Sequence, residues 1–307
     1  MKRRLSIVVA LTLTALLTSC CCAVKPDGRQ TVKIAYLPIT HALAVLQEAQ
    51  QLENAQGVQV ELVKYGSWSE LLDALNAGRV DGASVLIELA MKSKQQGIGL
   101  KAVALGHRDG NVLIVSNEIG SAADLKGKTF AIPHRQSSHY ILLLDALATA
   151  GLSAEDVKIT ELAPTEMPSA LASKQIDGYC VAEPFGAMGV SLGVGKVLFG
   201  SEELWKDSLC CALVFNDKFI ESRPETAKEF VESYKTACSS LTKETAKQVA
   251  EKFLNQKDEV LDISLQWISY NDPEITEETY NALVDRVKKY GLSDEPPAYG
   301  DFVKSDF

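Results

Sequence analysis

Short apolar, β-rich runs alternate along this chain with stretches in which apolar residues recur at helical spacing. One such stretch, residues 69–77, places Leu71, Leu72 and Leu75 on one helix face. Another, residues 140–150, is followed by Gly151, a typical helix stop. An alternating order of strands and helices predicts a doubly wound α/β fold. The predicted strands are residues 32–36, 58–63, 101–105, 112–115, 129–132, 157–162 and 212–215.

One segment of the sequence is repeated. ALNAGRVDGA at residues 74–83 returns as ALASKQIDGY at residues 170–179. Each copy predicts a helix, an Asp-Gly turn and a short strand. The copies lie about 100 residues apart, much farther than the period of a solenoid repeat. They therefore predict two similar α/β lobes.

The order of the elements predicts where these lobes begin and end. We expect lobe 1 to comprise residues 31–110 together with 208–307, and lobe 2 to comprise residues 111–207. The two crossovers, near residues 107–111 and 204–210, are the predicted hinge. After Arg223-Pro224 the pattern is largely helical, which predicts a tail that serves packing.

Composition and charge narrow the possible partners. Of the 307 residues, 46% are hydrophobic, which is enough for a large core. The net charge of -9 argues against nucleic acid or an anionic membrane surface as the partner.

The amino terminus has the features of a signal peptide. Lys2, Arg3 and Arg4 precede an apolar run at residues 5–17 that is too short to span a bilayer. The following Leu17-Thr18-Ser19-Cys20 resembles the lipobox of bacterial lipoproteins. That resemblance implies cleavage of residues 1–19, a fatty-acylated (palmitate-type) Cys20, a tether at residues 20–30, and an extracytoplasmic, membrane-anchored protein. An ordinary secretory peptide with another cleavage site is the alternative.

The cysteines outside this leader form no evident framework. Cys210 and Cys211 are adjacent, so in a strand they would point to opposite faces and make poor disulfide partners. Cys180 and Cys238 are interpreted as core thiols. The spacing matches no CxxC metal motif.

Four motifs in a fixed order carry a family resemblance: YLPIT at residues 36–40, the Asp-Gly unit at 75–83, LKGK at 125–128 and AEPF at 182–185. Together they resemble the solute-binding proteins of nitrate, bicarbonate, aliphatic sulphonate, taurine and hydroxymethylpyrimidine importers, over roughly residues 31–236. The resemblance implies a type II periplasmic binding protein fold with two hinged lobes. It also implies permease and ATPase partners of an ABC importer, with no catalytic residue and no cofactor.

Within that family the nitrate and bicarbonate branch is most similar, through Ser138-His139-Tyr140 and residues 179–187. This similarity implies a small oxyanion, such as nitrate or bicarbonate, or a sulphonate as the solute. A pyrimidine or thiamine precursor, another heterocycle and a divalent metal are alternative solutes of the same fold. Hydroxymethylpyrimidine synthases, which are similar in fold, provide an enzymatic alternative to which only Cys210-Cys211 points.

Ligands of open α/β sheets bind beyond the carboxyl ends of the strands, so the loops there are the predicted site. Helix N-termini at Ser67 and Ser138 offer N–H groups to an anion, and the hydroxyl groups nearby add further donors. Alternatively, the serines only cap their own helices and Trp68 is a core residue. The predicted ligand-binding residues are Pro38, Thr40, His41, Tyr65, Ser67, Trp68, Ser84, His107, Asn111, His134, Ser137, Ser138, His139 and Glu183.

All four histidines fall in loops that are expected to face the cleft or the crossovers. A histidine there either donates to an anion or, when neutral, binds a metal. Glu183 opposes a bare anion unless it is protonated, salt-bridged or aimed at a backbone donor, and it suits a solute with an amine or amidine just as well. Alternatively, it orients its own loop by hydrogen bonds. The alternative metal site, for zinc or nickel, comprises His41, His134, His139 and Glu183.

Overall fold

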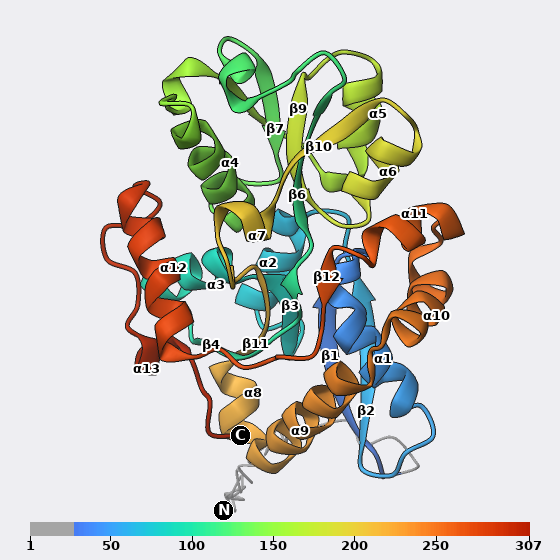
Figure 1. Ribbon diagram of the computed structural model, residues 1–307. Helices are drawn as coiled ribbons and strands as arrows, with labels where there is room; N and C mark the ends of the chain where they lie inside the picture. The colour runs from blue at the N-terminus through green and yellow to red at the C-terminus, as the bar shows by residue number, and fades with distance from the viewer. Residues whose placement is uncertain (1–27) are drawn as a thin grey trace, which may run out of the picture.

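Two five-stranded sheets organise residues 28–307, the part of the chain that the computed structural model describes, and each sheet is the centre of one lobe (Figure 1). The predicted signal peptide and Cys20 lie outside the described residues. The predicted α/β fold of two lobes is confirmed.

The sheet of lobe 1 has the order β2-β1-β3-β11-β4. β1 lies parallel to β2 and β3, whereas β11 is antiparallel to both of its neighbours. Because β11 comes from far along the chain, this sheet is complete only after the chain returns from lobe 2. The strands are β1 (Gln30–Tyr36), β2 (Val58–Lys64), β3 (Gly82–Leu86), β4 (Leu100–Leu105) and β11 (Cys211–Asn216).

The sheet of lobe 2 has the order β10-β6-β9-β7-β8 and repeats the same plan. β7 lies parallel to β8 and β9, and β6 is antiparallel to β9 and β10. In this lobe the antiparallel strand comes first in the sequence. The strands are β6 (Asn111–Ser116), β7 (Thr129–Ile132), β8 (Lys158–Glu161), β9 (Gly178–Ala182) and β10 (Gly195–Gly200).

Helices cover the faces of both sheets, as buried parallel strands require. In lobe 1 they are α1 (Leu43–Gln51), α2 (Trp68–Asn76) and α3 (Ile87–Gln95), with the 3-10 turn η1 (Thr40–Ala42) before α1. In lobe 2 they are α4 (Ser138–Thr149), α5 (Met167–Ala172), α6 (Phe185–Ser191) and α7 (Ser201–Leu204), with the 3-10 turns η2 (Ala122–Leu125), η3 (Ala154–Asp156) and η4 (Pro164–Glu166). The predicted helices 69–77 and 140–150 correspond to α2 and α4.

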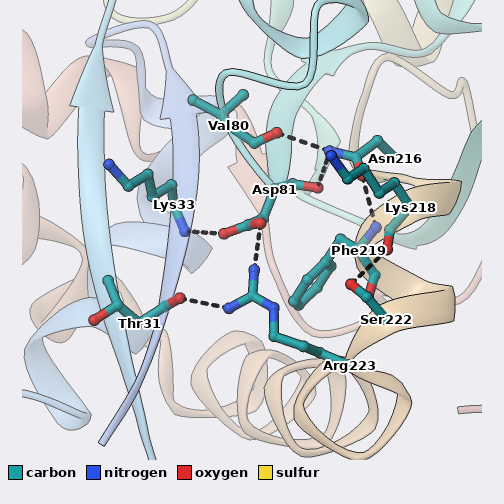
Figure 2. Close-up of polar contacts among 9 residues, drawn as sticks. All are labelled: Thr31, Lys33, Val80, Asp81, Asn216, Lys218, Phe219, Ser222 and Arg223. Atoms are coloured by element: carbon teal, nitrogen blue, oxygen red, sulfur yellow. Dashed lines mark hydrogen bonds and ion pairs between the residues drawn. The ribbon is translucent and has the colours of Figure 1, made fainter. Parts of the chain in front are cut away.

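The repeated segment forms the same structure in both lobes. Asp81 precedes β3, donates from its N–H to the Lys33 carbonyl at 2.9 Å, and accepts from the Lys33 N–H at 2.8 Å (Figure 2). Asp177 precedes β9 and makes the same two bonds with Thr129, at 2.7 and 2.8 Å. Each Asp-Gly turn therefore fastens the first parallel strand of its sheet to the strand that follows the turn.

The carboxyl-terminal region contacts both lobes. α9 and α10 pack on α1 of lobe 1, whereas α11 packs on α6 of lobe 2 (Figure 1). On α12, Arg286 forms an ion pair with Asp145 of α4 at 3.2 Å. The assignment of residues 208–307 to lobe 1 stays a prediction. The contacts of α11 and α12 show that this region also packs against lobe 2. The elements are α8 (Asp217–Ser222), α9 (Pro224–Ser240), α10 (Lys243–Leu254), α11 (Asp258–Ser264), α12 (Glu277–Lys289) and α13 (Tyr299–Phe302).

Two segments of the chain connect the lobes. The first runs from β4 to β6 and contains β5 (Arg108–Asp109), which pairs with β12 (Ile268–Ser269). The second leads from α7 back to β11. No helix within residues 28–307 is long and apolar enough to cross a membrane.

Candidate binding site between the lobes

Two histidines meet where the first connecting segment passes the loop after β1. His41 lies in η1, and His107 lies between β4 and β5. Their ring centroids are 3.6 Å apart, and both side chains are buried. Loops at the carboxyl ends of β1 and β4 thus place two imidazoles in contact at the junction of the lobes.

Backbone carbonyls fix the tautomer of each ring. His41 Nε2 lies 2.8 Å from the Gly110 oxygen, and His107 Nδ1 lies 2.7 Å from the Asp109 oxygen. A carbonyl oxygen only accepts hydrogen bonds, so these two nitrogens carry the protons. His41 Nδ1 and His107 Nε2 are consequently left with free lone pairs.

Two thiols lie beside those lone pairs. His41 Nδ1 is 3.7 Å from the sulfur of Cys210 and 3.6 Å from that of Cys211, and the sulfurs are 3.8 Å apart. His107 Nε2 accepts a long bond of 3.4 Å from the Cys211 N–H. The ligand atoms of His41, His107, Cys210 and Cys211, named here the His-Cys cluster, all lie within 4.8 Å of one another.

Cys210 and Cys211 were expected to point to opposite faces only if both lay in a strand, and that condition is not met. β11 begins at Cys211, so Cys210 precedes the strand and the alternation of side chains does not apply to it. The four cysteines of the described chain are free thiols. Sequence reasoning missed the pair as site residues, although a Cys-Cys step at a predicted crossover was a usable signal.

Burial keeps the His107 side chain neutral. Desolvation, reinforced by His41, lowers the pKa of His107 to about 4. Burial acts to raise the pKa of the Cys210 thiol, but hydrogen bonds from Cys211 and the histidines lower it below its usual value. Burial raises the pKa of Cys211. One of the two thiols therefore loses its proton more readily than the other.

Polar groups without partners surround the His-Cys cluster. Among the described residues, both ring nitrogens of His139, both carboxylate oxygens of Glu88, Asn111 Nδ2 and Ser138 Oγ are buried without a hydrogen-bond partner. Burial lowers the pKa of His139 to about 4, with smaller effects of Cys210, His41 and His107. Such unpaired groups are rare in folded proteins, so this region is the candidate binding site.

A separate pocket of about 410 Å³ opens between the lobes. Leu37, Pro38 and Ile39 line it from lobe 1 together with Tyr65. Lobe 2 contributes Pro164, Thr165 and Phe185. Its wall is largely apolar, in contrast to the polar cluster.

Thr40 and Glu183 join the lobes directly. The backbone N–H and the hydroxyl of Thr40 both donate to the Glu183 carbonyl oxygen, at 2.9 and 3.0 Å. Both carboxyl oxygens of Glu183 accept from the Ala187 N–H, each at 3.2 Å. Burial raises the pKa of Glu183 to about 8. Its side chain thus orients the start of α6, which is the second of the two predicted roles.

Several predicted site residues serve their own elements. Ser67 and Ser137 accept from the N–H groups of Glu70 and Tyr140 and so cap α2 and α4. Trp68 and Ser84 are buried at the start of α2 and within β3. The predicted serine caps and the core position of Trp68 thus describe these residues better than ligand contacts do.

The alternative metal set is not assembled. His134 Nδ1 accepts from the Gln136 N–H at 2.9 Å within its own turn, and Glu183 is engaged at α6. Within residues 28–307, the ligating atoms that converge are instead those of His41, His107, Cys210 and Cys211. Of the four predicted metal ligands, only His41 belongs to this cluster, and His139 lies near it.

The sequence profile of the NMT1-like family matches residues 25–255. The chain belongs to the NMT1-like family. Among solved structures, the ligand-binding component of an ABC-type import system from Staphylococcus aureus, with zinc bound, is 39% identical. It superimposes with a TM-score of 0.86, over 90% of this chain and 97% of that one.

Characterised relatives in the NMT1-like family carry several solute names. The taurine-binding periplasmic protein of Escherichia coli is 30% identical over 66% of this chain and 63% of its own. The nitrate import ATP-binding protein NrtC of Synechococcus elongatus is 27% identical over 89% of this chain. The chain spans only 42% of NrtC. The predicted family resemblance and type II periplasmic binding protein fold are confirmed.

The same fold also occurs in an enzyme. The desulfurization enzyme DSZB superimposes with a TM-score of 0.67 at 13% identity. At that identity the likeness shows the fold alone, so the function has to be argued from the site.

Proposed function

We propose that this chain is the solute-binding component of an ABC-type importer, which encloses a small solute between its lobes and delivers it to a permease with its ATPase. The observation that carries the proposal is the convergence of buried polar groups at the junction of the lobes. His41 and Glu88 come from lobe 1 and His139 from lobe 2. A ligand that pairs with them stabilises the closed form.

The buried groups favour a cationic solute over the predicted oxyanion or sulphonate. Thiols, carboxyl groups and neutral imidazoles are electron-pair donors. Among the described residues, Arg108 is the only buried lysine or arginine, and it is engaged by Asp272 and the Glu274 carbonyl. The zinc in the S. aureus relative is in keeping with this preference.

The apolar pocket favours a second candidate, a small organic solute. Its volume of about 410 Å³ lies within the usual range of small-molecule sites. Apolar walls at Leu37, Pro38 and Phe185 suit an alkyl chain or a heterocycle, such as the predicted pyrimidine. Both candidates keep the importer function and differ only in the solute.

We further propose that the chain acts without catalysis and is held outside the cytoplasm by a lipid on Cys20. The lipobox-like Leu17 to Cys20 supports the anchor, and the periplasmic relative in E. coli supports the location. Metabolic labelling with a fatty acid tests the anchor, since Cys20→Ala should abolish the label. Equal labelling of both proteins would contradict it.

A thermal-shift panel on delipidated, chelator-treated protein tests the binding function. The panel contains nitrate, bicarbonate, taurine, alkanesulphonates, pyrimidines and divalent metals. A true solute at about 100 times its dissociation constant should stabilise the fold by about 2.7 kcal/mol. No stabilisation by any member, or chemical turnover of a member that binds, would contradict the proposal.

Variants then test whether both lobes contribute. His139→Ala removes a lobe 2 partner, at a cost of roughly 1 to 3 kcal/mol, or about 5- to 150-fold in affinity for the solute identified by the panel. The exposed Lys243 on α10 supplies the control, and Lys243→Ala should leave affinity unchanged. Equal calorimetric affinities of His139→Ala and wild type would remove lobe 2 from the site.

A further inference from the structure

We propose that the His-Cys cluster is a four-coordinate site for one thiophilic transition-metal ion, with Zn²⁺ as the expected occupant. His41 Nδ1, His107 Nε2 and the two cysteine sulfurs are its ligands. The binding function proposed above makes this ion the solute, and that part of the inference rests on that function. The site itself rests on the geometry of the four side chains.

The spacing of the ligand atoms matches a tetrahedron around zinc. With Zn–S bonds of about 2.3 Å and Zn–N bonds of about 2.0–2.1 Å, tetrahedral angles separate two sulfurs by about 3.8 Å and a sulfur from a nitrogen by about 3.6 Å. The corresponding distances here are 3.8 Å between sulfurs, and 3.7 and 3.6 Å from His41 Nδ1 to Cys210 and Cys211. Three of the four vertices are thus already in place.

The fourth vertex is close to its position. His107 Nε2 lies within 4.8 Å of the other ligand atoms, and its ring packs on that of His41. Its present partner is the Cys211 N–H at 3.4 Å, a long contact that an incoming ion easily replaces. A small rotation of this ring closes the coordination sphere.

The hydrogen bonds around the histidines are those of metal ligands. A ligating histidine almost always donates its other ring N–H to a carbonyl or carboxylate, which fixes the tautomer and the ring orientation. Gly110 and Asp109 provide these carbonyls at 2.8 and 2.7 Å. Both free lone pairs are therefore held on the side of the sulfurs before any ion arrives.

Charge balance also favours a divalent ion. In the complex both cysteines are thiolates, and the protons that they lose go to water, so Zn²⁺ and its four ligands carry no net charge. A neutral centre avoids the large cost of an unpaired charge in a buried position. S₂N₂ tetrahedral coordination favours zinc over the octahedral oxygen sites of Mg²⁺ and Ca²⁺.

The location determines how the ion enters. His41 belongs to lobe 1, whereas His107 and Cys210 lie on the two segments that connect the lobes. All four ligands are buried, and the bonds from Thr40 to Glu183 hold the lobes together beside them. Exchange of the ion therefore requires separation of the lobes.

Metal titration of the whole mature chain, purified without a histidine tag and reduced, tests the site. Co²⁺ serves as the probe, because thiolate ligation gives a charge-transfer band and tetrahedral geometry gives intense visible bands. We expect one Co²⁺ per chain with both signals, release of protons to the solvent as Co²⁺ binds, and displacement of the Co²⁺ by one Zn²⁺. A reduced wild-type protein that binds neither metal would overturn the site.

Substitutions assign the signal to the cluster. Cys211→Ser should lose the charge-transfer intensity of one thiolate, and zinc affinity should fall by more than the roughly 10- to 100-fold that an outer-shell partner is worth. Cys238→Ser changes another buried cysteine and should bind as wild type. His107→Gln provides a second test if Cys211→Ser is unstable. Unchanged binding in a folded cluster variant would overturn the inference.

Two further outcomes separate this inference from the importer function. Stabilisation by nitrate, taurine or a pyrimidine without binding of Zn²⁺, Co²⁺ or Cu⁺ would overturn the metal site and leave the importer function standing. One zinc bound by the cluster, with zinc uptake by cells unchanged when the gene is deleted, would support the site and overturn its role as solute carrier.

Discussion

The two Asp-Gly turns have the same backbone bonds and different side-chain partners. Asp81 in lobe 1 also forms an ion pair with Arg223, at the start of α9 (Figure 2). Arg223 donates as well to the Thr31 carbonyl at 2.8 Å and lies over the Phe219 ring. Asp177 in lobe 2 has only Lys128, at 3.8 Å and half exposed.

The difference reflects how each lobe is built from the chain. Lobe 2 is one continuous segment, so its turn needs only the backbone bonds. The chain returns to lobe 1 at β11, and the bonds of Arg223 to Asp81 and to the Thr31 carbonyl fasten the start of α9 to the turn before β3 and to the first residues of β1. The Asp-Gly turn of lobe 1 therefore has a second role, because its aspartate also joins two segments that lie far apart in the sequence.

The largest effect on stability is expected from adding a side chain at the glycine of either Asp-Gly turn. A Cβ at Gly82 would lie 2.8 Å from the Val214 carbonyl oxygen, and one at Gly178 would lie 2.8 Å from that of Ile114. Backbone atoms within a sheet cannot move aside, so Gly82→Ala and Gly178→Ala should each cost about 3 kcal/mol in the free energy of unfolding. Urea denaturation followed by circular dichroism measures both.

Gly300→Ala is the control for these substitutions, because nothing lies within 4 Å of its added Cβ. This substitution should change the midpoint of urea denaturation very little. If Gly178→Ala were as stable as this control while Gly82→Ala unfolded, the two turns would not be equivalent.

A smaller effect, and one that differs between the lobes, is expected from removing the charge of each aspartate. Asparagine keeps an acceptor for the strand N–H. Asp81→Asn loses a charge-assisted bond at a site that is 20% exposed, which should cost about 1 to 2 kcal/mol. Asp177→Asn should cost less than about 0.5 kcal/mol, because solvent screens its pair with Lys128. If both variants lost the same free energy of unfolding in urea denaturation, the ion pair of Asp81 with Arg223 would add nothing to the stability of lobe 1.

The smallest effect is expected at Lys128. The ion pair of Lys128 with Asp177 is long and exposed, so Lys128→Ala should change stability by less than about 0.5 kcal/mol.

Arg223→Ala should cost more, because it removes the bonds to Asp81 and Thr31 together. Repeating both measurements at 1 M salt sharpens the contrast, because the Debye length falls to about 3 Å and screens the exposed pair first.

Local signals explain which parts of the fold were predictable. The Asp-Gly turns were visible because the aspartate, the glycine and the preceding helix lie within ten residues of sequence. β10 was missed because it begins and ends with glycine and exposes Lys196 and Val197. Contacts of α11 and α12 with lobe 2 were also missed, since helical periodicity shows that a face is buried and not what covers it.

The binding region was predictable only in outline. The strand-end loops pointed to His41 and His107, because the fold places such loops at the junction of the lobes. His134, only five residues from His139, is used inside its own turn, which depends on backbone angles that spacing does not reveal. The meeting of the Cys210 and Cys211 thiols was not predictable, because the strand begins at Cys211 and the alternation of strand side chains does not extend to Cys210.

The strand order of lobe 1 affects the order in which the two lobes can fold during synthesis on the ribosome. The sheet of lobe 2 is complete once Gly200 has emerged, whereas β3 and β4 wait for β11, which ends at Asn216, to come between them. Nascent domains fold as units when their last element leaves the exit tunnel. Lobe 2, although second in sequence, is therefore the first lobe that can fold. Lobe 1 closes around an already folded insert, and both cysteines of the junction emerge at that late step.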